Sequence, residues 1–145
     1  MKNRNLTARG AALAGAMALG LVAISAGTAQ AGVEMCQLRI DVVEADLNGT
    51  VDGTDCSGVQ ILGGNPGQTC DSLNSKLDSA SRKLDEIKLE DAYLDLSNFV
   101  TKVTDLTVLN AKGEAKIADG ETTTVDQLIH DGEVARDCVG GLLGY

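Results

Sequence analysis

A short acidic segment holds the most suggestive candidate metal ligands in the chain. The sequence "DLNGTVDGTD" places carboxylate and amide oxygens at nearly the spacing of calcium-binding loops. The segment fits the pattern of these loops only if two central residues of the pattern are left out, so a shorter loop would have to surround the ion. The alternative is a polar turn, because Asn-Gly and Asp-Gly are turn-forming dipeptides. We therefore predict no bound cofactor, with calcium as the alternative, in which case the ligands are Asp46, Asn48, Asp52 and Asp55.

Few residues in the chain could perform catalysis. The only histidine is His130, and its neighbour Asp131 would point elsewhere on a helix, because adjacent helical positions do not face each other. Four serines share one polar helix face, where solvent exposure explains them better than a nucleophile that needs a positioned base: Ser72, Ser75, Ser79 and Ser81. The sequence therefore predicts that the protein is not an enzyme.

The four cysteines are spaced 20, 14 and 68 residues apart, which suits disulfide bonds better than a zinc site. Zinc sites use close pairs of ligands and usually more histidine than this chain contains. An even number of cysteines in an exported domain indicates two disulfides and an oxidising compartment. Four cysteines allow three pairings, and the choice among them depends on the fold.

Four segments repeat apolar residues at alternating spacings of three and four, which is typical of amphipathic helices. The apolar faces span residues 33–47, 73–87, 92–106 and 125–139. We expect Thr69 or Asp71 to cap the second helix, a threonine before Val125 to cap the fourth, and Gly140 with Gly141 to end the fourth. The β-branched run near Val103 favours a strand by propensity, but its apolar positions fit the helical period. The pattern predicts an all-α fold, a small up-and-down bundle of about four helices with two disulfides.

Up-and-down connectivity predicts the disulfide pairing. The start of the first helix and the end of the fourth lie at the same end of such a bundle, which brings Cys36 to Cys138. Cys56 and Cys70 then close the connection between the first two helices at the opposite end.

The first 31 residues have the features of a secretory signal peptide. A basic start with Lys2, Arg4 and Arg9 precedes an apolar run, and "TAQA" offers a cleavage site after Ala31. The apolar run is shorter than the roughly 20 residues that span a bilayer. We expect residues 1–31 to be removed and residues 32–145 to form a single helical domain that is secreted, extracellular and not attached to a membrane.

The predicted secreted domain is strongly acidic. It holds nine basic and 21 acidic residues, a net charge of about −12. Such a charge repels nucleic acids and anionic surfaces, so neither is expected as a partner.

The sequence "CDSLNSKLDSASRKLDEIKLEDAYLDLSNFVTKVTDL", followed by "GEAKI" and "VDQLI", resembles the FIMAH-type helical domain. The resemblance covers residues 68–131 and rests on helix-core positions, an Asn-Phe pair and the order of the turns. The matching positions are Lys76, Leu77, Ala80, Leu84, Ala92, Leu96, Asn98, Phe99, Val103, Gly113, Ile117, Leu128 and Ile129. That family occurs mostly near the C-terminus of secreted bacterial enzymes and surface proteins, so the resemblance implies an accessory or interaction domain.

These features together predict a secreted, non-catalytic accessory or binding module that interacts with a protein or a cell-surface component. The alternative is a small secreted enzyme inhibitor or effector that presents the loop between Cys56 and Cys70. In either case the apolar residues of that loop are the predicted binding residues: Val59, Ile61 and Leu62.

Overall fold

The computed structural model describes residues 22–145, so most of the predicted signal peptide lies outside the described residues. In this part the chain forms four helices, α1 (Val22–Asn48), α2 (Pro66–Asp85), α3 (Leu89–Thr107) and α4 (Val125–Leu143). Two short strands, β1 (Val59–Ile61) and β2 (Ile117–Asp119), pair antiparallel. The prediction of a disulfide-bonded all-α bundle is confirmed, whereas the strand pair was not expected.

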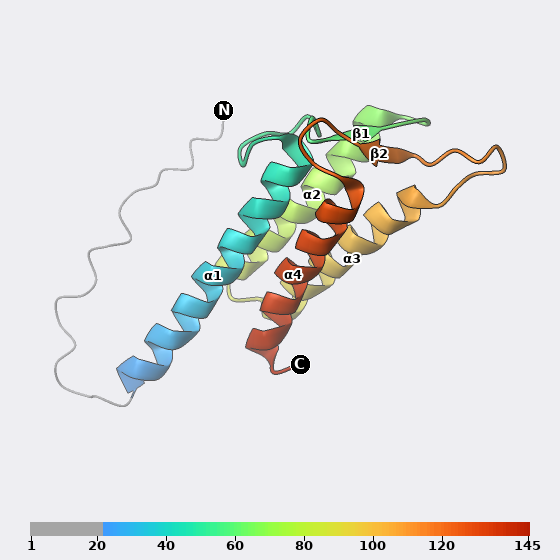
Figure 1. Ribbon diagram of the computed structural model, residues 1–145. Coiled ribbons are helices and arrows are strands. Elements are labelled where there is room, and N and C mark those ends of the chain that lie inside the picture. Colours follow the sequence, from blue (N-terminus) through green and yellow to red (C-terminus); the bar gives the residue numbers. More distant parts are fainter. Residues whose placement is uncertain (1–21) are drawn as a thin grey trace.

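The four helices surround one apolar core (Figure 1). Helix α2 packs along α3, α3 along α4, and α4 along α1, while α1 and α2 contact each other less. The predicted apolar faces supply the core, and its largest fully buried side chains include Phe99, Ile40, Leu73 and Leu128. Ile87 is an exception. It lies beyond the end of α2 in the left-handed conformation (φ 58°) and is 68% exposed, so it does not continue the predicted apolar face.

Helix α2 begins about one turn before the predicted capping residues. Asn65 is the N-cap, and its side-chain oxygen accepts a hydrogen bond of 3.1 Å from the backbone N–H of Gln68. Pro66 occupies the first helical position, where its missing N–H costs nothing. The prediction of Thr69 or Asp71 as the cap was therefore wrong, because Asn-Pro provides both signals of a helix start.

Helix α4 begins at the predicted threonine cap but continues past the predicted end. The Thr124 hydroxyl accepts a hydrogen bond of 3.1 Å from the N–H of Gln127. The helix runs through Gly140 and Gly141 and ends at Leu143, followed by the C-cap residue Gly144, whose φ of 86° suits glycine. Gly140 is buried, and a Cβ there would lie 3.2 Å from the Tyr93 ring. The glycine thus permits close packing of α4 and does not end it.

Both predicted disulfides are confirmed. The Cys36–Cys138 bond joins α1 to α4, with 5.5 Å between the Cα atoms and 102 residues of sequence separation. The Cys56–Cys70 bond closes the connection between α1 and α2 at the other end of the bundle, with a Cα separation of 5.9 Å. All four cysteines are thereby paired, which agrees with an oxidising, extracellular compartment.

Helix α1 extends past the end of α4 on the N-terminal side (Figure 1). Residues 27–31 are exposed, and Cys36 is the first buried residue after them. Among the helices over residues 22–145, none combines the length and apolar character needed to cross a bilayer.

Candidate functional site

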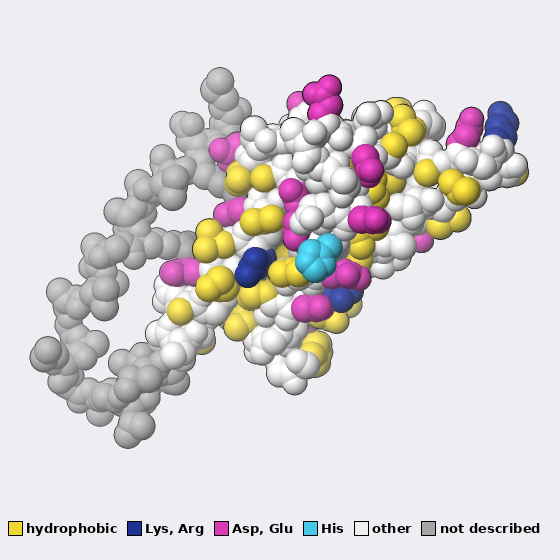
Figure 2. Space-filling view, in the orientation of Figure 1, with side chains coloured by type: hydrophobic (Ala, Val, Ile, Leu, Met, Phe, Trp, Pro, Cys, Tyr) yellow, Lys and Arg dark blue, Asp and Glu magenta, His cyan; other side chains and the backbone are white. Residues whose placement is uncertain are grey.

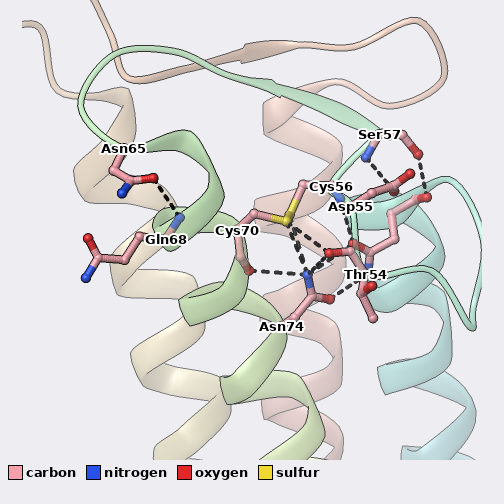
Figure 3. The surroundings of a disulfide bond; sticks show 9 residues. Thr54, Asp55, Cys56, Ser57, Asn65, Gln68, Cys70 and Asn74 are labelled. Atoms are coloured by element: carbon pink, nitrogen blue, oxygen red, sulfur yellow. Dashed lines mark hydrogen bonds between the residues drawn. A yellow bond between two sulfur atoms is a disulfide. The ribbon is translucent and has the colours of Figure 1, made fainter. Parts of the chain in front are cut away.

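The loop between Cys56 and Cys70 is the best-defined surface feature of the protein, and several contacts fix it to the bundle. Its disulfide attaches the start of the loop to the second turn of α2 (Figure 3). Cys56 itself has φ 54°, a conformation that a residue other than glycine keeps only when its surroundings hold it. The loop is therefore built into the end of the bundle.

A pair of asparagines behind the disulfide provides the second attachment. The Asn48 side chain donates to the Asn74 side-chain oxygen at 2.7 Å, and Asn74 donates back at 3.2 Å. The Asn48 oxygen also accepts a hydrogen bond of 2.9 Å from the backbone N–H of Cys56. The Asn74 side chain also donates to the carbonyl oxygen of Thr54 at 3.2 Å (Figure 3). Sequence reasoning missed Asn74, although its position one turn after Cys70 places it on the same helix face.

The predicted calcium ligands have separate surroundings in the structure. Asn48 is 2% exposed, and its side chain bonds Cys56 and Asn74, as described. Asp55 accepts a hydrogen bond of 3.1 Å from the N–H of Ser57, and bonds from the Ser57 hydroxyl and N–H lower the pKa of Asp55. Asp52 is exposed. Over residues 22–145 no group of three or more His, Cys, Asp or Glu side chains is arranged to hold a metal ion.

Asp46 differs from the other predicted ligands because it faces α4. Burial, a hydrogen bond from protonated Asp46 to the side chain of Asp131 and the charge of Asp131 raise the pKa of Asp46 to about 6. The Asp46 carboxyl thus belongs to the interface between α1 and α4. It is not part of the loop that follows it.

The strand pair is the third attachment of the loop and decides which of its apolar residues are accessible. Val59 is 5% exposed and Ile61 packs partly against the core, whereas Leu62 is 42% exposed. Strand alternation explains this, since Val59 and Ile61 lie on the same face of β1. The backbone N–H of Leu62 donates to the carbonyl oxygen of Lys116 at 2.8 Å. Of the three predicted binding residues, Leu62 is therefore the one that the loop presents to solvent.

A cleft of about 460 Å³ lies between this loop and the first turns of α2. The disulfide forms part of its wall, Val59, Ile61 and Pro66 supply apolar surface, and Asp55 and Asp71 supply carboxylates. Its remaining lining residues are Thr54, Ser57 and Gly67, so the lining contains two acidic residues and no basic one. The arrangement suits a ligand that offers both apolar surface and positive charge.

The residues considered for catalysis lie apart from the cleft. His130 is an exposed residue of α4 (Figure 2 shows the single histidine at the surface among acidic side chains). Two of the four serines do not face solvent freely, contrary to expectation. Ser81 is 5% exposed and accepts a hydrogen bond of 2.8 Å from Gln37, and Ser72 accepts one of 2.6 Å from Lys102. These serines connect helices.

Comparison of the chain with family models, with curated proteins and with solved structures found no match.

Proposed function

We propose that the protein is an exported, non-catalytic binding module that recognises a protein or a cell-surface component through the Cys56–Cys70 end of the bundle. The observation that carries this proposal is the triple attachment of the loop. A disulfide and an asparagine pair hold its start at Cys56, and a two-stranded sheet holds the segment Val59–Ile61. A surface that is already ordered loses less conformational entropy on binding, so such bracing favours recognition.

The sequence supports the same proposal. The signal-peptide features of residues 1–31 and the pairing of all four cysteines suit a protein that works outside the cell. The resemblance of residues 68–131 to the FIMAH-type domain implies an accessory role beside other secreted or surface proteins. The acidic charge favours a partner with basic surface over nucleic acid.

A second candidate function is inhibition of a secreted enzyme. It is favoured by the tip of the loop, where exposed Leu62 precedes Gly63 and Gly64, both with positive φ (69° and 63°). This tip is exposed and braced on both sides, as a segment that enters the active site of another protein must be. Partner binding and inhibition share one surface, so the identity of the partner decides between them.

Site-specific photo-cross-linking tests the proposal. A photoreactive amino acid replaces Leu62 in the oxidised full-length chain, and a control chain carries it at Leu94, which is 57% exposed on α3. Both chains are exposed to the envelope and medium of the producing organism. We expect an adduct from position 62 that disappears when the disulfides are reduced, and none from position 94. Identical adducts from both positions, or none from position 62, contradict the proposal. An enzyme in the adduct whose activity falls on binding favours the inhibitor.

A further inference from the structure

Strand β1 has one edge that β2 does not cover. Across the ladder Gln60 lies opposite Ala118, and the N–H of Leu62 donates to Lys116. Because backbone groups alternate between the two edges of a strand, Gln60 and Leu62 face β2. The N–H and carbonyl of Ile61 therefore point to the opposite edge. Such an edge is a template for pairing with another extended chain.

The uncovered edge of β1 faces the cleft. The cleft is lined by Val59 and Ile61, and not by Gln60. The N–H of Val59 already bonds the carbonyl oxygen of Cys56 at 3.3 Å, so Ile61 supplies the open N–H of this edge. A peptide paired with this edge would thus lie in the cleft, with its side chains against Pro66 and the disulfide. Backbone pairing would fix its direction, and the cleft would select its side chains.

The charges around the cleft determine which side chains fit. Asp55 and Asp71 line it, and both are exposed, so a cationic group can approach either carboxylate. Hydrogen bonds from Ser57 lower the pKa of Asp55, which favours its charged form. The domain as a whole is acidic, so its field also favours a cationic segment over an anionic one.

The N-terminus of α2 does not reverse this preference. A helix start attracts anions through its unsatisfied N–H groups. Here Pro66 has no N–H, the N–H of Gln68 is capped by the Asn65 side chain, and the N–H of Thr69 bonds the Asn65 carbonyl at 3.0 Å. The N–H groups of Gln68 and Thr69 are thus occupied, which leaves only that of Gly67 in the first turn, and the carboxylates of Asp55 and Asp71 line the same cleft.

We propose that the cleft binds an extended segment of a partner protein that carries lysine or arginine, and that this segment adds to the free edge of β1 as a third strand. This inference rests on the proposed function and specifies the chemistry of the partner at the same surface. It differs from the proposal of an inhibitory loop, because the recognised chain lies in the cleft and not at the Leu62 tip.

Model peptides test the charge preference. Two labelled eight-residue peptides, one alternating lysine with valine and one alternating glutamate with valine, are titrated with the oxidised full-length chain by fluorescence anisotropy. We expect the lysine peptide to bind at least about tenfold more tightly, and its affinity to fall with salt because exposed charges are screened. Equal affinity for the two peptides, or no binding of the lysine peptide, overturns the inference. Neither result affects an adduct obtained from position 62, so the proposed function is judged separately.

Paired variants localise the charge effect. Replacing both cleft carboxylates (Asp55→Asn with Asp71→Asn) should weaken binding of the lysine peptide about threefold to tenfold, as expected for two exposed ion pairs. The control makes the same change in net charge at the other end of the bundle, with Glu34→Gln and Asp85→Asn, which are also exposed. We expect the control to bind within about twofold of the parent protein. An equal loss in both variants would show attraction by net charge alone and overturn the assignment to the cleft.

Hydrogen exchange tests strand addition without any substitution. In the free protein the amide of Ile61 faces the open edge, while that of Leu62 is bonded to Lys116. Saturation with the lysine peptide should slow exchange of the Ile61 amide at least about tenfold and leave Leu62 nearly unchanged. Unchanged exchange at Ile61 in the saturated complex would exclude pairing with β1.

Discussion

The carboxyl group of Asp46 on α1 faces that of Asp131 on α4, so that protonated Asp46 can donate a hydrogen bond to Asp131. A carboxylate has no proton to donate, so this bond exists only while one member of the pair is protonated. The Oδ2 atom of Asp46 is buried without a hydrogen-bond partner, and the Gln127 side chain donates to Asp131 at 2.6 Å. The hydrogen bond of this pair, which adds to the packing and the disulfide between α1 and α4, therefore depends on a proton.

This pair predicts that stability depends on pH. The pKa of Asp46 is raised from 3.8 to about 6 in the folded protein, so the folded state holds more protons than the unfolded state between these values. Its contribution to stability is present below pH 4 and is lost as the pH rises through 6. Asp46→Asn should raise the melting temperature at pH 7.5, leave it nearly unchanged at pH 4, and flatten the pH dependence. Circular-dichroism melts from pH 4 to 8 measure this, and parallel curves for the two proteins would refute it.

The core should not accommodate a larger side chain at Gly132 of α4. Gly132 is buried, and a Cβ at this position would lie 3.0 Å from Val100 and 3.4 Å from the Phe99 ring. Gly132→Val should lower the free energy of unfolding by about 2–3 kcal/mol, because overpacking outweighs the gain in helix propensity. The control Gly141→Val lies on the same helix with no side chain nearby, and should leave stability equal or slightly higher. Urea denaturation compares them. Equal effects would mean that α4 does not pack as closely as described.

The hydrogen bonds of Asn74 should contribute to the stability of the protein. Asn74→Ala removes the partner of the Asn48 side chain and of the Thr54 carbonyl. We expect a loss of about 1–3 kcal/mol, because polar groups are left unsatisfied behind the disulfide. The exposed neighbour Ser75→Ala should change stability by less than about 0.5 kcal/mol. The Cys56–Cys70 bond should also be reduced faster by dithiothreitol in Asn74→Ala. Unaltered reduction and stability would show that the asparagine pair does not hold the loop.

The two disulfides should contribute unequally to stability. Replacing Cys36 and Cys138 by alanine removes a disulfide that spans 102 residues, and the chain-entropy model predicts a loss of about 4–5 kcal/mol in the free energy of unfolding. Removing the Cys56–Cys70 disulfide, which spans 14 residues, should cost about 3 kcal/mol. Urea denaturation of the two double variants gives the order, and non-reducing peptide mapping of the parent protein tests the pairing. A greater loss from the shorter link would contradict the entropy argument.

Calcium is expected to leave the melting temperature unchanged at millimolar concentration. Asn48, the central predicted ligand, is buried and already bonded to Cys56 and Asn74, and Asp46 faces α4. Melts with and without calcium, in the parent protein and in Asp46→Ala, measure this. A rise of several degrees that Asp46→Ala abolishes would establish the segment as a calcium site.

The sequence was sufficient for the bundle because its apolar faces follow the helical period over several turns, and because helix order then leaves one pairing of the cysteines. The contacts that fix the loop between Cys56 and Cys70 could not be predicted from the sequence. The register between Val59 and Asp119 joins segments 60 residues apart, and three-residue strands carry too short a pattern to recognise.

Context also decided the roles of single residues. Local sequence predicts Gly140 as a helix breaker, yet the Tyr93 ring would lie 3.2 Å from a Cβ at this position, so the glycine allows α4 to pack closely there. Asn48 has a side chain that could bind a metal, yet it forms a structural hydrogen bond with Asn74, which lies 26 residues away. In both cases the deciding neighbour comes from another helix, which no local pattern reveals.

The bond between Cys36 and Cys138 also determines how the domain responds to mechanical force. A pull applied to the chain before Cys36 and after Cys138 passes from α1 to α4 through the sulfur atoms. The intervening chain, with the cleft and the shorter disulfide, then carries no tension. A partner held in that cleft could therefore be retained under a pull that would unravel an unlinked bundle.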